Sequence, residues 1–246
     1  MRYLILSDIH ANWEALDAVL AHARGNYDQV LCCGDLVGYG ADPNPVVEWV
    51  RVNAAGIVRG NHDKACAGLE DLEWFNAVAR ISAEWTLKTL SAENAAYLRR
   101  LRKGPLVFNG FDLVHGSPLD EDEYLVTLND IVQLRPYLES HLIFFGHTHL
   151  QGGFLVHRNG IRKIEKTRIR FDDKTIELEP DPIYLINPGS VGQPRDGDPR
   201  AAYAIYTPEE RLVCYHRVTY EVAKAQTKIL DAGLPDMLAE RLATGN

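Results

Sequence analysis

Hydrophobic residues in the first third of the chain switch between two spacings. Short apolar runs typical of buried strands lie at residues 2–7, 29–35 and 55–60. The segments between them, 11–24 and 43–53, carry apolar residues at helical spacing. Asn12 is placed to cap the first helix, and prolines stand in the first turn of the second. Alternating strands and helices predict βαβ units and a mainly parallel sheet.

The remaining pattern predicts further helices and a second group of strands. Residues 70–101 read as helical, with Ser91 as a plausible N-cap of the second helix there. A hairpin turning at Asn109-Gly110 is expected over 106–116, then a helix over 130–138 and a strand over 142–146. After residue 150, strand-like runs separated by turns predict a mostly antiparallel sheet, and the tail from Tyr220 reads as helical. With no repeat, low-complexity segment or linker, we expect a single domain over residues 1–246 with two sheets.

Composition places the chain in a broad class. Its 246 residues, 46% of them hydrophobic, can bury a substantial core without disulfides or a structural metal. The four cysteines show no CxxC spacing, which suits a reducing compartment. The apolar stretch at the N-terminus is too short for a signal peptide, and no run approaches the length of a membrane span. We therefore expect a cytoplasmic protein without a membrane partner; a homo-oligomer is compatible with the sequence.

The net charge of −8 argues against nonspecific binding to nucleic acid or to anionic membranes, which both reward basic surfaces. One segment runs against this balance, because residues 158–170 include six basic side chains. Glu165 and the strand-like pattern of this segment favour an exposed, charged hairpin that discourages edge pairing. Nucleic-acid binding at this segment is the weaker alternative.

Polar side chains with metal-binding chemistry follow five of the expected strands. They are Asp8 and His10, Asp35, Asn61 and His62, His115, and His147 and His149. The carboxyl ends of strands form the ligand crevice of open α/β sheets, so these side chains are expected at one rim. Taken singly, each motif has an ordinary explanation as a helix cap, a turn or a structural histidine. Five of the nine histidines lie at these strand ends, and the combination indicates a metal site.

The ligand types select a class of metal. Carboxylates, imidazoles and an amide oxygen, without a thiolate, suit Mn²⁺, Fe or Zn²⁺, whereas Mg²⁺ and Ca²⁺ prefer more oxygen ligands. Leaving His62 aside, seven candidate ligands remain, more than the four that tetrahedral zinc takes. The surplus favours two divalent metal ions about 3.5–4 Å apart that share a bridging carboxylate.

The order of these motifs resembles a known family. The series D-x-H, G-D, G-N-H-D, H-G and G-H-x-H, from Asp8 to His149, is similar to the calcineurin-like metallophosphoesterase superfamily. The later stretch NPGSVGQPR at 187–195 resembles its compact prokaryotic phosphodiesterase-like branch, so the likeness covers nearly the whole chain. It implies an α/β fold, a four-layer α/β/β/α sandwich of two mixed sheets, which agrees with the two sheets expected from the pattern.

The resemblance also implies a role for each site residue. One metal would be held by Asp8, His10 and His149, and the other by Asn61, His115 and His147, with Asp35 bridging them. His62 would face the scissile phosphate, and Asp63 would orient its ring, as carboxylates commonly orient imidazoles.

The activity expected from these roles is a dinuclear metal-dependent phosphoesterase acting on a small phosphodiester or phosphomonoester, such as a nucleotide. Two divalent cations lower the pKa of a bridging water, and the resulting hydroxide would attack phosphorus in line with the leaving oxygen. Protonated His62 would donate to that oxygen or stabilise the transition state.

One departure from the family pattern narrows the substrate. Gly34-Asp35 leads into LVGYGADPNP and not into the V-D-R-G stretch of the protein Ser/Thr phosphatases, which weakens that assignment. Three further residues are candidate substrate contacts: Tyr39, Arg195 and Asn12. A guanidinium matches phosphoryl oxygens bidentately, but Arg195 could equally be a solvated loop residue. For Tyr39, packing within the turn is the alternative to a substrate contact. For Asn12, capping the helix is the first interpretation and donation to a substrate the second.

Two other functions stay open at this stage. A nuclease of the same superfamily is the nearest enzymatic alternative, and the acidic net charge counts against it. A catalytically silent, protein-binding scaffold is the alternative from a different class, because one retromer subunit has this fold but lacks the catalytic histidine. The presence of His62 favours catalysis.

Overall fold

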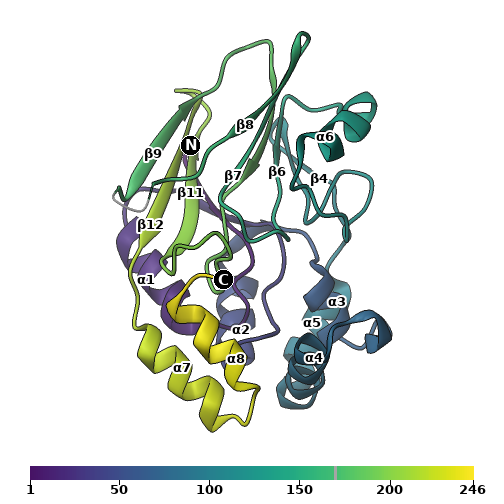
Figure 1. The fold of residues 1–246 in the computed structure, drawn as a ribbon, viewed down its shortest axis with the longest axis vertical. Coiled ribbons are helices and arrows are strands. Elements are labelled where there is room, and N and C mark those ends of the chain that lie inside the picture. Colours follow the sequence, from purple (N-terminus) through teal and green to yellow (C-terminus); the bar gives the residue numbers. More distant parts are fainter. Residues whose placement is uncertain (169–170) are drawn as a thin grey trace.

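Strands from both halves of the chain are interleaved in two mixed sheets. The structure, a computed structural model, describes residues 1–168 and 171–246, and two six-stranded sheets lie within this part of the chain (Figure 1). The first sheet has the order β3 (Ala54–Ile57), β2 (Gln29–Cys32), β1 (Tyr3–Leu6), β11 (Ala201–Thr207), β12 (Leu212–Val218) and β9 (Asp173–Glu177). The second has the order β4 (Leu106–Phe108), β5 (Phe111–Leu113), β6 (Leu142–Phe144), β10 (Ile183–Asn187), β7 (Gly152–His157) and β8 (Gly160–Ile164).

The expected separation into a parallel first half and an antiparallel second half was wrong. Strand β11 pairs antiparallel with β1, while β10 pairs parallel with β6, so each sheet combines early and late strands. Both sheets are therefore mixed, as the four-layer fold requires. Hydrophobic pattern identifies strands but carries little information about which distant strand pairs with which, because pairing is decided by tertiary packing.

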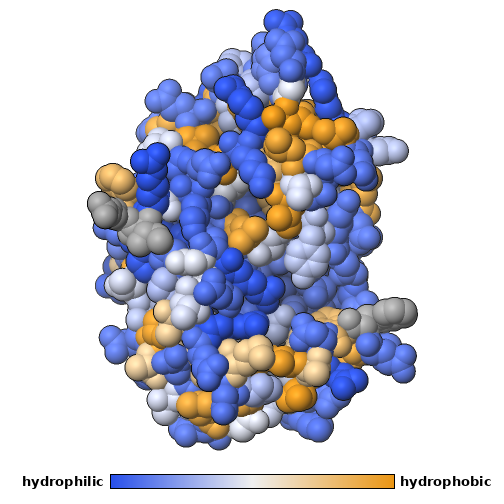
Figure 2. Space-filling model, viewed as in Figure 1, coloured by the Kyte–Doolittle hydropathy of each residue, from blue (hydrophilic) through white to orange (hydrophobic). Residues whose placement is uncertain are grey.

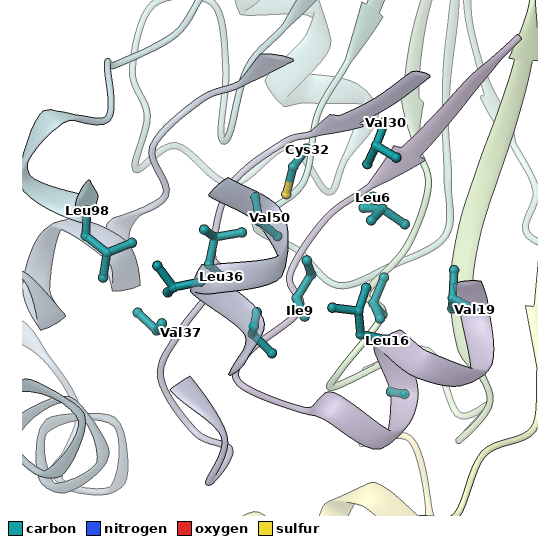
Figure 3. Close-up of a cluster of buried hydrophobic side chains, with 14 of the residues drawn as sticks. Leu6, Ile9, Leu16, Val19, Val30, Cys32, Leu36, Val37, Val50 and Leu98 are labelled. Atoms are coloured by element: carbon teal, nitrogen blue, oxygen red, sulfur yellow. The ribbon is translucent and has the colours of Figure 1, made fainter. Parts of the chain in front are cut away.

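Period-two alternation in the central strands explains how the sheets are layered. In β1, Leu4 and Leu6 face a core shared with helices, whereas Tyr3 and Ile5 face a core between the two sheets. Figure 3 shows the first of these cores, where Leu6, Val30 and Cys32 of the sheet meet Leu16, Val19 and Val50 of the neighbouring helices. Burial on both faces accounts for the nearly continuous apolar runs of these strands.

Helices cover the outer faces of both sheets. The helices packed on the first sheet include α1 (Trp13–Ala23), α2 (Pro43–Asn53), α4 (Ala77–Thr89) and α5 (Ala92–Arg100). On the second sheet, α6 (Leu128–Leu134) buries Ile131 and Leu134 against strand residues such as Ile143 and Phe154. The layers are therefore helix, sheet, sheet and helix. The remaining short elements are α3 (Asn61–Cys66), η1 (Leu72–Trp74) and η2 (Arg135–Tyr137).

Several local predictions are confirmed. The Asn12 side chain accepts from the Ala15 amide at 3.1 Å, and Ser91 accepts from the Asn94 amide at 3.1 Å, so both residues cap helices as expected. Asn109 and Gly110 are the two central residues of the β4–β5 hairpin. Segment 158–170 was expected to form an exposed hairpin. Within it, Gly160–Ile164 is strand β8, which pairs with β7 in a hairpin, and residues 169–170 lie outside the described residues.

The C-terminal segment forms α7 (Val222–Asp231), α8 (Asp236–Glu240) and η3 (Arg241–Ala243). Helix α7 packs beside α1, and α8 and η3 pack against α7 (Figure 1). The face of the molecule in Figure 2 is mostly hydrophilic, with hydrophobic residues gathered around α6, where Leu128 and Val132 are exposed. Within the described chain, no helix has the length and apolar character needed to cross a membrane.

Candidate metal centre

The loops after β1, β2, β3, β5 and β6 meet at one end of the sheets. They bring six of the seven expected ligands into two groups whose ligand atoms lie within 4.8 Å of one another: Asp8, His10, Asp35 and His149, and Asp35, His115 and His147. Asp35 belongs to both groups. The seventh residue, Asn61, places its Oδ1 3.2 Å from Nε2 of His115, beside the second group.

Asp35 occupies the centre of this arrangement. Its Oδ2 lies 3.6 Å from Nε2 of His10 and 3.3 Å from Nε2 of His115, so it faces histidines of both groups. The other oxygen, Oδ1, accepts from the His62 amide at 2.9 Å, which fixes the orientation of the carboxylate. Burial opposes ionisation of Asp35, but the charges of His115 and His62 outweigh it and hold its pKa well below the ordinary range.

Two carboxylate oxygens at the centre are buried without a hydrogen-bond partner. These are Oδ2 of Asp8 and Oδ2 of Asp35. Burial raises the pKa of Asp8 to about 7, with His115 opposing the shift and Asp35 adding to it. A buried carboxylate oxygen without a hydrogen bond costs on the order of a few kcal/mol, and a coordinated cation would remove that cost. The residues present therefore fit divalent metal ions.

Backbone carbonyls fix the histidine tautomers. Nδ1 of His10, His115 and His149 donates to the carbonyls of Val37, Cys33 and Gln193, at 3.0, 2.7 and 2.6 Å respectively. A carbonyl only accepts, so each ring carries a proton on Nδ1, and Nε2 is the nitrogen that faces the centre. His147 is the reverse: its Nε2 faces the Asp122 carbonyl at 3.1 Å, which leaves Nδ1 as its free nitrogen.

The ligand loops have unusual backbone geometry. Five of the seven expected ligands have φ values in the left-handed region: Asp8 (52°), His10 (49°), Asp35 (55°), His147 (65°) and His149 (59°). Such conformations cost about 1–3 kcal/mol each and persist where surrounding contacts enforce them. Here Asp8 donates its amide to the Gly34 carbonyl at 3.0 Å, and His10 donates to the Asp35 carbonyl at 3.0 Å. The loops are held by one another.

Two motif glycines are explained by close approach. A Cβ at Gly60 would overlap the Asp35 carboxylate, and a Cβ at Gly146 would overlap the Ser7 hydroxyl and come within 2.9 Å of Asp8 Oδ2. Neither has a positive φ in the structure, so space and not backbone freedom requires glycine there. The G-N-H-D and G-H-x-H motifs begin with glycine for this reason.

His62 borders a solvent-open cavity next to the second ligand group. The cavity, about 680 Å³ including its mouth, is also lined by Asn61, Tyr39, Phe75 and His147. The His62 ring packs against Tyr39, with ring centroids 4.4 Å apart, and its buried Nδ1 has no partner. Burial lowers the pKa of His62 to about 4, so the protonated ring expected from the sequence is not the form that this environment favours near neutral pH.

Asp63 does not orient His62, and that expectation was wrong. Its Oδ2 accepts from the amides of Gly60 at 3.0 Å and Asp35 at 2.9 Å, and its Oδ1 accepts from the amides of Leu36 at 2.8 Å and Val37 at 3.4 Å. The carboxylate therefore ties the loop after β2 to the start of α3. Burial, with repulsion from Asp35, raises its pKa to about 7.

Tyr39 and Arg195 both lie at the centre. The Tyr39 ring, 6% exposed, has its centroid 4.7 Å from that of His10, between this ligand and His62. The Arg195 guanidinium carbon lies 5.4 Å from the centroid of the Tyr39 ring, as in a cation–π contact. Both residues are thus placed where a substrate on the metal groups could reach them.

The hydrogen bonds of the Asn12 side chain are all made within the protein. Besides capping α1, it donates from Nδ2 to the Gly192 carbonyl at 2.9 Å and to the Tyr220 hydroxyl at 3.3 Å. Both amide donors are used and the side chain is buried, so the expected donation from Asn12 to a substrate is contradicted.

Some groups that contact the ligand histidines could not be predicted from the sequence pattern. The carbonyls of Val37, Cys33, Gln193 and Asp122 orient the ligand rings, but a backbone carbonyl leaves no residue-type signal. Tyr124, whose ring centroid is 3.9 Å from that of His147, was missed because it stands in a loop without a motif.

Comparison with known proteins agrees with this geometry. Residues 1–211 match the model of the calcineurin-like phosphoesterase superfamily domain. An uncharacterized protein of Methanocaldococcus jannaschii is 36% identical over 98% of this chain and 97% of its own length. A crystal structure of a metallophosphoesterase from Sphaerobacter thermophilus has a TM-score of 0.87 at 40% identity, covering 100% of this chain and 99% of that one.

A hypothetical protein from Pyrococcus horikoshii shares the fold at 18% identity, with a TM-score of 0.79 over 100% of this chain and 98% of that one. The two mixed sheets flanked by helices, the aspartate and histidine groups at their strand ends and the match over most of the chain agree with one another. The chain belongs to the calcineurin-like phosphoesterase superfamily.

Proposed function

We propose that this protein is a phosphoesterase that depends on two divalent metal ions and hydrolyses small phosphodiesters or phosphomonoesters. The observation that carries the proposal is the pair of buried aspartate and histidine groups that share Asp35. A single shared carboxylate between two ligand groups is the arrangement expected of a dinuclear hydrolytic site. The unpartnered oxygens of Asp8 and Asp35 support it, because cations would satisfy both.

The proposed ligands divide between the two ions. Asp8, His10 and His149 would hold one, and Asn61, His115 and His147 the other, with Asp35 shared. Neutral imidazoles and carboxylates without a thiolate suit Mn²⁺, Fe or Zn²⁺. The described cysteines near the site are buried, and burial raises the pKa of Cys32 and Cys33 above the ordinary range, so both thiols stay protonated.

The chemistry divides between the ions and the protein. When bound, two divalent cations supply a water of lowered pKa and positive charge for the phosphoryl oxygens. His62 lines the wall of the cavity and would donate a hydrogen bond to the leaving oxygen. Arg195 adds a fixed positive charge beyond Tyr39, which favours an anionic substrate. The open cavity suits a small ester better than a folded protein.

Hydrolysis of two chromogenic esters tests the proposal. Bis-p-nitrophenyl phosphate and p-nitrophenyl phosphate should be hydrolysed in the presence of Mn²⁺, and chelation should abolish the activity. Asp35→Asn should remove it, whereas His141→Ala, an exposed histidine outside the site, should not. A protein that binds metal but hydrolyses neither ester with Mn²⁺, Fe²⁺ or Zn²⁺ would overturn the enzyme assignment in favour of a scaffold.

A further inference from the structure

A buried arginine of the first sheet has no part in the chemistry proposed above. Arg217 belongs to β12, is 2% exposed and is among the largest of the fully buried side chains. Within the described residues, neither ligand group includes it. Its guanidinium reaches two loops that follow strands of the second sheet: the β6 loop (residues 145–151) and the β10 loop (residues 188–200). Taking a charged group out of water costs on the order of several kcal/mol unless partners compensate it, so the contacts of Arg217 need an explanation.

The guanidinium of Arg217 uses all three of its nitrogens. Nη2 pairs with Oδ2 of Asp196, Nε donates to Oε1 of Gln151 at 3.2 Å, and Nη1 donates to the Arg200 carbonyl at 3.3 Å. Asp196 and Gln151 are also joined directly, because the Gln151 amide donates to Asp196 Oδ2 at 3.3 Å. A guanidinium holds its donors in one fixed plane, so it sets the angle between its partners, which a flexible ammonium does not. Arg217 therefore ties the β6 loop to the β10 loop.

The same two loops control the orientation of one metal ligand. His149 stands two residues before Gln151 in the β6 loop, and Gln193 stands three residues before Asp196 in the β10 loop. The His149 ring donates from Nδ1 to the Gln193 carbonyl at 2.6 Å, and the His149 carbonyl accepts from the Arg195 amide at 3.2 Å. The direction of the His149 ring thus depends on how the β10 loop lies against the β6 loop. That relationship is what the buried guanidinium fixes.

Stability alone does not account for this buried ion pair. The side chains of Arg217 and Asp196 are 0% and 6% exposed, so both charges are almost fully removed from water. Lys166, which is partly exposed, lies 3.8 Å from the other oxygen of Asp196, Oδ1. Replacing a buried ion pair by uncharged residues of similar volume is often neutral or stabilising, because desolvation offsets the attraction. An apolar pair would not supply directed hydrogen bonds to two loops, and this is the contribution that Arg217 makes.

We propose that Arg217 is a positioning residue for His149 and for the metal group to which His149 belongs. It acts through Asp196 and Gln151, which hold the two loops together. The inference rests on the proposed function for the presence of two metal ions, and it goes beyond that function by assigning a role to a residue outside both ligand groups. Removing an outer partner of a metal-bound histidine commonly lowers metal affinity by about 10–100-fold. Because His149 belongs to one group only, loss of Arg217 should weaken one ion and spare the other.

Calorimetric titration of Mn²⁺ into the metal-free protein tests this role. Arg217→Met should weaken one of the two Mn²⁺ equivalents by about tenfold or more and leave the other unchanged. Arg217→Lys should restore part of the loss, since an ammonium can still pair with Asp196. Arg200→Met is the matched control, because the Arg200 side chain is 14% exposed and pairs with Asp198 and Asp172. This control should bind both equivalents like the wild type.

A second background separates positioning from a general effect on the fold. In His149→Ala the ring that Arg217 positions is gone, so adding Arg217→Met should cause no further loss at the Mn²⁺ equivalent that remains. Should Arg217→Met not fold, because Asp196 is left buried and unpaired, the double variant Asp196→Asn/Arg217→Met removes both charges and should show the same selective loss. Thermal unfolding of each variant shows whether it folds.

The outcomes separate this role from the proposed activity. Equal weakening of both equivalents by Arg217→Met, unchanged binding of both, or a further loss in the His149→Ala background would overturn the positioning role, even in a protein that hydrolyses the chromogenic esters. Conversely, a selective loss that disappears in the His149→Ala background supports the role of Arg217 even if no ester is hydrolysed, in which case only the proposed activity fails.

Discussion

Nε2 of His147 donates to the backbone carbonyl of Asp122 at 3.1 Å, so this ring presents Nδ1 to the metal centre while its neighbour His149 presents Nε2. The two histidines of the G-H-x-H motif, one residue apart, therefore use different nitrogens. Each belongs to a different ligand group, and Asp35 belongs to both. The motif therefore spans the two groups.

Lys64 holds the Asp122 loop against α3 and is expected to position His147. Its Nζ lies 2.8 Å from Asp122 Oδ2, 3.2 Å from Glu70 Oε2 and 3.5 Å from Glu121 Oε1. Lys64→Met should weaken the binding of one of two Mn²⁺ equivalents by about tenfold, as loss of an outer partner commonly does. Calorimetry measures this, with the exposed Lys88→Met as a matched control. Equal loss at both sites would contradict the positioning role.

Metal binding should stabilise the folded protein through Asp35. A ligand that binds only the native state adds about 2.7 kcal/mol at a free concentration one hundred times its Kd. Saturating Mn²⁺ should therefore raise the Tm by several degrees, and chelation should reverse the shift. In Asp35→Asn, which removes the shared carboxylate, the Tm should no longer respond. A full Mn²⁺ response in this variant would show that the ions bind elsewhere.

Removal of the His62 ring should separate catalysis from metal binding. The ring lines the cavity, but neither ligand group includes it. His62→Ala should lower kcat for bis-p-nitrophenyl phosphate by about 10²–10³-fold, the usual cost of removing one hydrogen-bond donor to an oxygen that gains negative charge. Two Mn²⁺ equivalents should remain bound, as measured by elemental analysis after dialysis. Loss of metal from this variant would assign His62 to the ligand set instead.

Asp63 should matter for stability, because it accepts from four backbone amides in two loops. In Asp63→Asn one acceptor oxygen becomes a donor facing N–H groups, which leaves buried amides without partners. We expect a loss of about 2 kcal/mol or more in the free energy of unfolding, measured by urea denaturation. Asp17→Asn, an exposed aspartate of α1, should change it by less than about 0.5 kcal/mol.

The contact between α1 and α7 should make stability depend on pH. Oε1 of Glu14 lies 2.7 Å from Nζ of Lys228 and 3.0 Å from Nζ of Lys224, and Lys228 also contacts Asp42 at 2.7 Å. Burial opposes ionisation of Glu14, but the two lysines outweigh it, and its pKa is lowered from 4.5.

A lowered carboxyl pKa adds stability above the unfolded value, and this is lost as pH falls through the folded value. Glu14→Gln should thus cost about 1 kcal/mol at pH 7, allowing for solvent screening of the partly exposed lysines, and much less near pH 3. Urea denaturation at both pH values measures the difference. A cost that does not change with pH would assign the effect of Glu14 to packing alone.

The sequence predicted individual helices, helix caps and a hairpin, but not which distant strands pair in the sheets. Helix ends at Asn12 and Ser91 and the hairpin at Asn109-Gly110 depend on local chemistry, and all three were placed correctly. The insertion of β11 beside β1 was not foreseen, because strand partners far apart in the chain are chosen by packing across both sheets.

The sequence by itself determined which side chains could meet at the strand ends, since a carboxylate or imidazole at that position is a property of the residue and of the strand before it. Only the tertiary structure decided how those side chains are used. It oriented the His147 ring through the Asp122 carbonyl and directed the Asp63 carboxylate to four backbone amides of two loops. The physical reason is that hydrogen-bond partners on the backbone, and charges from distant segments, leave no trace in the local pattern of residues.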